Sequence, residues 1–149
     1  MCQGNSKYGE DSQAVQAHLG IMQTIIQRMA SNSASCKAWC ITLVSAILVM
    51  IADKGKPEFA LIAIIPAILF LVLDTYYLAL EKMFRASYNS FIDKLHSGKL
   101  ESSDLYAVIP KGSMFKTFFL SLISFSIWPF YLTLLGMILI AKAIVITNT

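Results

Sequence analysis

One carboxylate stands at the edge of an apolar run. In FLVLDTYYLALEKMFRASY, residues 70–88, Asp74 separates hydrocarbon side chains from a charged segment, and no Gly or Pro interrupts the helical phase. Ionisable groups inside a membrane are costly and are functional by default, so Asp74 is a candidate for lining a cation path. The alternative is an acid at the inner membrane interface that is solvated or paired with Ser or Thr.

Small hydroxyl side chains form a second polar feature, near the C-terminus. Thr117, Ser121 and Ser124 share one helical face at spacings of four and three, and Pro129 in SIWPFY frees a backbone carbonyl. Such residues commonly bond back to their own helix and allow close helix packing. The alternative is that this face lines a water-filled path in an oligomer, with Pro129 as the kink.

Residues for catalysis or metal binding are scarce. His18 and His96 are the only histidines, and no nucleophile or second carboxylate stands in a fixed relation to them. The three cysteines, Cys2, Cys36 and Cys40, lack nearby ligand partners and lie on the reducing side of the predicted topology. We therefore expect no enzyme, no cofactor, no metal centre and no disulfide.

The amino-acid composition indicates whether these residues lie in water or in a membrane. The 149 residues are 56% hydrophobic and only 14% charged, and the mean hydropathy is +0.63. A soluble domain has roughly 25% charged residues. The chain is therefore predicted to be a single, all-α integral membrane domain.

Three apolar segments are candidates for membrane spans. Residues 117–141 carry no charge and rise about 37 Å as a helix, against a hydrocarbon core of about 30 Å. Residues 59–73 reach a spanning length if the helix continues through Asp74 to residue 80. Residues 38–52 gain length if Lys37 and Asp53 snorkel. We expect about three transmembrane helices.

Charge and turn residues set the expected topology. DKGKPE, residues 53–58, predicts the turn of a helical hairpin. Nine Lys and Arg residues fall on one side of the predicted spans and three on the other, so the nine are placed in the cytoplasm. The predicted regions are a cytoplasmic N-terminal amphipathic helix at 1–37, a transmembrane hairpin at 38–80, a cytoplasmic helix and loop at 81–116, and a third transmembrane helix with an outside C-terminus at 117–149.

Two helical faces extend into the predicted cytoplasmic part. The second span continues in helical phase toward Gly98, which makes a long cytoplasmic extension. A heptad seam runs through the N-terminal region and continues in register to Met50. We expect its first five positions to pair copies of the chain, with packing against the 81–95 helix of the same chain as the alternative. These positions are Val15, Leu19, Met22, Ile26 and Met29.

Basic side chains are distributed along the segment between the second and third spans. Repeated around an oligomer axis, they would form a cationic ring able to hold a phosphate backbone. The alternative is an ordinary loop of nearly balanced charge, as six basic and four acidic residues in 81–116 indicate. The candidate nucleic-acid-binding residues are Lys82, Arg85, Lys99, Lys111 and Lys116.

Three stretches, HLGIMQTIIQRMASNSASCKAW, IADKGKPEFALIAIIP and FLVLDTYYLALEKMFR, followed by one late span, resemble the small membrane effectors of bacterial anti-phage defence. The layout is most similar to the effectors of the Hailong system. This resemblance implies a bacterial inner-membrane toxin that forms a homo-oligomer, expected to be a tetramer. It also implies a channel kept closed by single-stranded DNA from a partner nucleotidyltransferase, which opens on infection.

The sequence therefore supports two functional hypotheses. The first is an oligomeric, ion-conducting effector held closed by a cytoplasmic nucleic-acid ligand, with Asp74, Ser121, Ser124 and Pro129 in the pore or gate. The second is a non-conducting membrane adaptor that oligomerises and recruits a soluble cytoplasmic partner.

Overall fold

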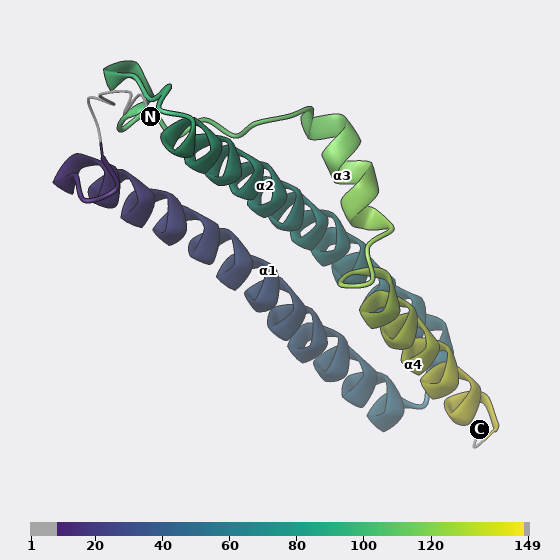
Figure 1. Ribbon diagram of the computed structural model, residues 1–149. Helices are drawn as coiled ribbons and strands as arrows, with labels where there is room; N and C mark the ends of the chain where they lie inside the picture. Colours follow the sequence, from purple (N-terminus) through teal and green to yellow (C-terminus); the bar gives the residue numbers. More distant parts are fainter. Residues whose placement is uncertain (1–8, 148–149) are drawn as a thin grey trace.

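The computed structural model describes residues 9–147, and in that part of the chain it is helical with no strand (Figure 1). Cys2 and Lys7 lie outside the described residues. The elements in chain order are α1 (Gln13–Lys54), η1 (Pro57–Ala63), α2 (Ile64–His96), η2 (Ser102–Asp104), α3 (Met114–Leu122) and α4 (Trp128–Thr147).

Two long antiparallel helices, α1 and α2, form the frame of the molecule (Figure 1). Gly55 joins them in a left-handed conformation, with φ 60°, that caps α1, and η1 leads into α2. We call this the turn end. At the opposite, loop end lie the start of α1, the end of α2 and the loop 97–113, where Gly98, with φ 66°, follows the last turn of α2.

One face of α1 is buried from Val15 to Ile51, a distance of 36 residues and about ten helical turns. The first heptad positions, Val15, Met22 and Met29, are buried as a seam would be. The seam does not continue to Met50, which is exposed, because Ile51 is buried instead. A straight helix drifts about 20° per heptad, so over five heptads the buried stripe moves by one residue.

The uncharged run 117–141 is not one helix, which corrects the expected third span. α3 ends at Leu122, and residues 123–127 form a turn in which the Ser124 carbonyl accepts hydrogen bonds from the amides of Ile127 and Trp128, at 2.9 and 3.3 Å. Pro129 then occupies the first turn of α4. Proline has no N–H and clashes with the preceding turn of a helix, so it begins a new helix more easily than it continues one.

α4 runs beside α1 and α2 toward the turn end, and α3 lies along α2 (Figure 1). The buried apolar side chains form two clusters. One lies in the half of the molecule nearer the turn end and combines residues of α1, η1, α2 and α4 with Ile127, and the other lies at the loop end and joins α1, α2 and the loop. The first consists of Cys40, Val44, Ala63, Ala67, Ile127, Tyr131, Leu134 and Ile138, and the second of Val15, Met22, Phe91, Leu95 and Leu100.

Within residues 9–147, three helical segments are long and apolar enough to cross a membrane: Gln13–Lys54, Phe59–His96 and Trp128–Thr147. Their most apolar windows are only 22–28% buried within the chain, so most of this apolar surface faces outward. Exposed apolar surface on that scale is foreign to soluble monomers and fits contact with lipid. The prediction of an all-α protein with three potential membrane spans is confirmed.

Candidate functional site

A buried charge pair joins α1 to α2. The Asp74 side chain on α2 is completely buried, and its carboxylate lies 2.6 Å from Nζ of Lys37 on α1. The Ser33 hydroxyl donates a hydrogen bond to Oδ1 of Asp74, and Lys37 donates to Ser33 Oγ at 3.4 Å. Asp74 is therefore paired with a hydroxyl and an ammonium group rather than exposed to water in a single chain.

Helical spacing explains why the α1 partners converge. Ser33 and Lys37 are four residues apart and lie one above the other on the same face. The Lys37 side chain keeps 22% of its surface exposed, as a snorkelling stem does, while its amine reaches inward. From the sequence, Lys37 was predicted to be a snorkelling residue and a topology charge, and its four-residue spacing from Ser33 was the signal that could have identified it as a site residue.

Tyr131 extends the cluster to α4. Its ring is 4% exposed, and its hydroxyl faces Asp74, yet it makes no hydrogen bond of acceptable geometry in the described part of the chain. Oδ2 of Asp74 also lacks a well-aligned hydrogen bond, although Lys37 is 2.6 Å away. The Lys37 contact is therefore a close ion pair. The cluster thus holds two buried oxygens with spare bonding capacity.

Burying such a pair does not by itself stabilise a protein. The desolvation of two charges can exceed their mutual attraction, whereas removing only one partner leaves an uncompensated charge. In hydrocarbon the penalty is larger, so intramembrane charges are kept where they serve a site. Chemically, the cluster offers no nucleophile; it can hold a charge, exchange a proton, or present a carboxylate to a cation if Lys37 moves.

The other predicted pore residues occupy three different settings. Ser121 is fully buried near the end of α3, and its hydroxyl has no hydrogen-bond partner among the described residues. Ser124 lies in the turn between α3 and α4, half-buried, with its carbonyl engaged. Pro129 lines a groove of about 480 Å³ between α1 and α4, beside Ser45 and Thr133. Thr117 and Ser121 share a face of α3, but Ser124 lies beyond the end of that helix, so the three hydroxyls do not share one continuous helical face.

The predicted basic residues all belong to the loop-end half, but one chain does not gather them into one site. Arg85 pairs with Glu81 at 2.8 Å, and Lys111 donates to Ser90 Oγ at 2.8 Å. Lys99 lies beyond the end of α2, roughly 20 Å from Arg85 along the helix axis. The remaining two are Lys82, half-buried on α2, and Lys116, exposed on α3.

A cavity of about 560 Å³ with a mixed polar and apolar lining lies at the loop end. It is lined in part by Ser87, Ser90 and Lys111, together with Lys94 and Asp104. Lys94 donates to Asp104 at 2.6 Å, and this hydrogen bond, with that from the Glu101 amide, holds the pKa of Asp104 below its usual value. Lys94 was not predicted as a site residue, because only the fold of the loop brings it to Asp104.

The predicted oligomerisation seam is largely used within the chain. Val15, Met22 and Met29 are buried, and Val15 and Met22 pack with Phe91 and Leu95 of α2. Leu19 is half-buried against the same cluster, and Ile26 is half-buried beside a groove that includes Tyr88. These positions therefore follow the alternative in which the seam packs on α2 of the same chain.

The site is thus a buried polar joint of α1, α2 and α4, set within apolar surroundings, together with a cavity at the loop end. Comparison with family models, curated proteins and solved structures finds no match to this chain.

Proposed function

We propose that the chain is a small membrane effector whose copies assemble into an ion-conducting pore controlled from the loop end. The observation that carries the proposal is the buried Lys37–Asp74 pair with its spare oxygens on α2 and α4. A lipid anchor needs no such charges, and their desolvation is a standing cost. A carboxylate that can become available when helices shift is what a cation path requires.

Conduction needs more than one copy. Asp74 is completely covered in the single chain, and the outward faces of α1, α2 and α4 carry large apolar side chains such as Val49, Ile65 and Ile140. A water-filled path requires polar lining, so it must open along interfaces that these helices form with other copies. A homo-oligomer, with a tetramer as the simplest model, supplies those interfaces.

The loop end is the place for a controlling ligand. Its cavity is lined by Lys94, Lys111 and three serines, together with the acid Asp104, and Lys99 and Lys116 are exposed elsewhere in the loop-end half. Ammonium and hydroxyl donors are the groups that bind phosphate oxygens. Under the resemblance described above, the ligand is a cytoplasmic single-stranded DNA that holds the pore closed. Its loss on infection would depolarise the bacterial inner membrane.

Ion flux into liposomes tests the conduction proposal. Purified protein would be reconstituted, and flux compared among wild type, Asp74→Asn and Asp53→Asn, the last being a matched neutralisation of an exposed acid at the turn end. We expect Asp74→Asn to change the cation-to-anion preference or to reduce the flux at least tenfold, and Asp53→Asn to behave as wild type. Equal flux and selectivity in wild type and Asp74→Asn would remove Asp74 from the path.

The ligand proposal has its own test. Binding of a fluorescent single-stranded oligonucleotide would be measured for wild type, Lys111→Glu and Lys54→Glu, which reverses a charge at the turn end. We expect Lys111→Glu to weaken binding at least tenfold, Lys54→Glu to have no effect, and wild-type affinity to fall steeply with salt. Salt-independent binding, or equal binding by both variants, would contradict a phosphate site at the loop end.

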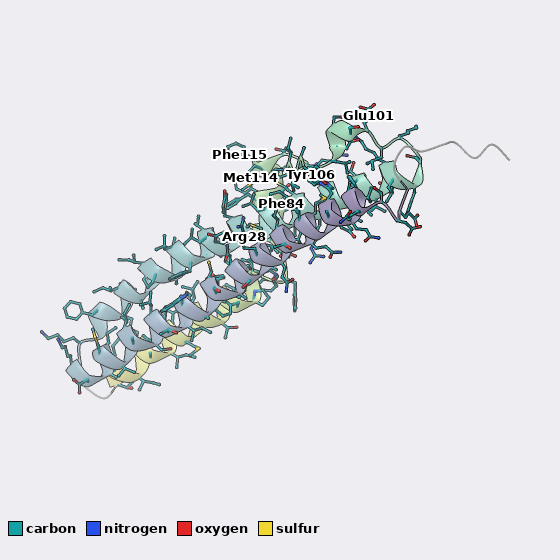
Figure 2. All side chains as sticks on the ribbon, turned by 90° about the vertical axis from the view of Figure 1, so that its left-hand side faces the viewer. Arg28, Phe84, Glu101, Tyr106, Met114 and Phe115 are labelled. Carbon is teal, nitrogen blue, oxygen red and sulfur yellow. The ribbon has the colours of Figure 1, made fainter. Side chains whose placement is uncertain are left out.

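An adaptor function is the second candidate, and exposed apolar side chains near the loop end favour it. Tyr106, Ile109 and Phe115 are 63%, 72% and 81% exposed, and Figure 2 places Tyr106 and Phe115 on the side of the bundle that carries α3. A soluble partner would cover such a patch. Replacing the spans with an unrelated membrane anchor distinguishes the functions: an adaptor retains its cellular activity, whereas a pore loses it.

A further inference from the structure

The two histidines of the chain lie at the loop end in opposite environments. His96 is exposed, with Nε2 3.7 Å from a carboxylate oxygen of Glu10. His18 is 1% exposed, and its ring lies against Phe91 with ring centroids 4.4 Å apart. His18 precedes the apolar segment that starts at Ala38 by roughly 30 Å of helix, so it belongs to the part of α1 outside the membrane-crossing segment.

The His18 ring holds the loop through one specific hydrogen bond. Its Nδ1 accepts the backbone N–H of Tyr106 at 2.9 Å. Only an imidazole with a bare Nδ1 can accept, so the ring must be neutral and carry its proton on Nε2. A protonated ring has hydrogens on both nitrogens, and its Nδ1–H would then face the Tyr106 N–H donor to donor.

The residue that receives this support is held against its own backbone preference. Tyr106 has φ 64°, the one left-handed non-glycine conformation in the described part of the chain. Bulky residues seldom adopt this conformation unless the surrounding structure imposes it. Loss of the His18 bond therefore removes a restraint from a strained point in the loop, and this loop connects α2 to α3.

The charged groups around His18 do not provide a substitute for the lost bond. Asp104 of η2 is the carboxylate whose charge acts on His18. Its oxygens, however, already accept hydrogen bonds from Lys94 and from the Glu101 amide. Lys94 on α2 and Lys111 in the loop line the same cavity and oppose an added positive charge. Burial lowers the pKa of the His18 imidazole below 6.5, and Asp104 offsets only part of that shift.

We propose that His18 is a proton-operated latch: protonation of its ring releases residues 97–113 from α1 and frees the connection into α3. When the loop is released, His18 is exposed and its pKa returns to the ordinary value. Its imidazole therefore binds a proton more tightly in the released state than in the docked state. The docked state is fully favoured above about pH 6.5, and its advantage falls by up to tenfold for each pH unit below that value. This inference does not depend on ion conduction.

Hydrogen exchange of the loop tests the latch. The full chain in detergent or nanodiscs would be compared at about pH 7.5 and pH 5.5, after correction for the intrinsic exchange rate, as wild type, His18→Gln and His96→Gln. Gln carries a flexible amide oxygen that can accept the Tyr106 N–H and does not titrate, and His96→Gln is the matched control at the exposed histidine. We expect protection of the amides at residues 104–109 to fall about tenfold at pH 5.5 in wild type and His96→Gln, and to stay constant in His18→Gln. Equal loss of protection in His18→Gln and wild type, or no loss in wild type, overturns the proposal.

A measurement on the unaltered chain covers the case in which His18→Gln fails to fold. Nitrogen-15 NMR of the two histidine side chains reports both tautomer and titration. We expect one imidazole to remain neutral, with Nδ1 as the acceptor, to a lower pH than the other. Two imidazoles that titrate together, or a buried ring protonated at Nδ1 near neutral pH, would refute the latch.

Discussion

Asp74 and Lys37 lie 2.6 Å apart on neighbouring antiparallel helices, and the Ser33 hydroxyl donates to the same carboxylate. This contact lies inside the apolar half of the molecule, where Tyr131 of α4 also faces the acid. Three helices thus meet around one buried charge pair. Its stability and its accessibility are the quantities that a functional account must explain.

A double-mutant cycle at this pair separates charge from packing. Lys37→Met leaves a buried carboxylate without its counter-ion, and Asp74→Asn leaves an ammonium group in apolar surroundings. We expect each single change to lower the free energy of unfolding by roughly 3 kcal/mol, and the double change to cost clearly less than the sum. Unfolding of the detergent-solubilised protein, followed by circular dichroism, gives the values, and additive costs would show that the two groups do not interact.

The Tyr131 hydroxyl faces Asp74 but has no well-aligned hydrogen-bond partner among the described residues, and it makes the opposite prediction. Because the hydroxyl is buried and makes no aligned hydrogen bond, Tyr131→Phe removes a desolvated polar group without breaking a bond. We expect stability to be unchanged or to rise by up to about 1 kcal/mol. Tyr77→Phe, at a half-buried position on α2, is the control for loss of a hydroxyl.

Flux through reconstituted Tyr131→Phe then shows whether the spare oxygen is used. A variant that is as stable as wild type but conducts less would place the hydroxyl on the ion path. A stability loss of about 2 kcal/mol or more would instead mean that the hydroxyl has a bonding partner, because that is the cost of breaking a buried hydrogen bond.

The seam on α1 allows a test of packing within the chain against packing between copies. Met22 is 3% exposed in the loop-end core, whereas its neighbour Ile21 is 42% exposed. We expect Met22→Ala to destabilise the fold by about 2–4 kcal/mol and Ile21→Ala by less than about 0.5 kcal/mol, with the oligomer size unchanged in both. Light scattering and unfolding curves measured together check this. Dissociation of an oligomer by Met22→Ala, with no change in subunit stability, would return the seam to an interface between copies.

Local pattern was enough to predict the membrane class, because hydropathy over about twenty residues depends on composition and length alone. It was also enough to predict the hairpin, since Gly55 and Pro57 follow directly on an apolar helix. Asp74 was identified as unusual for the same local reason. Its partners were not, because Lys37 and Tyr131 are distant in sequence and only the packing of three helices brings them together.

Two errors have the same physical origin: a periodic pattern was extended further than a helix carries it. The α1 seam was continued to Met50, but the drift of a straight helix buries Ile51 instead. The third span was predicted as one helix over residues 117–141 with Pro129 as its kink, although α3 ends at Leu122 and α4 begins at Trp128. In both cases the structure follows the first part of the predicted pattern. The later part differs because the helical phase drifts along α1 and because the backbone leaves the helix after α3.

Replacement of Pro129 tests why α3 and α4 are separate helices. In Pro129→Ala the residue regains an N–H that can bond to the preceding turn, and the ring clash with that turn is removed. The intervening sequence ISFSIW, residues 123–128, contains no glycine, so a continuous helix from α3 into α4 becomes accessible. We expect amides 123–129 to gain at least tenfold protection from hydrogen exchange in Pro129→Ala, while Pro66→Ala, within the first turn of α2, leaves this segment unchanged. Because α3 lies along α2 rather than in line with α4, straightening would also draw α3 away from α2 and alter gating in the flux assay. Unchanged exchange in 123–129 would mean that packing of Ser121 and Ile127, both fully buried, sets the break and that proline only tolerates it.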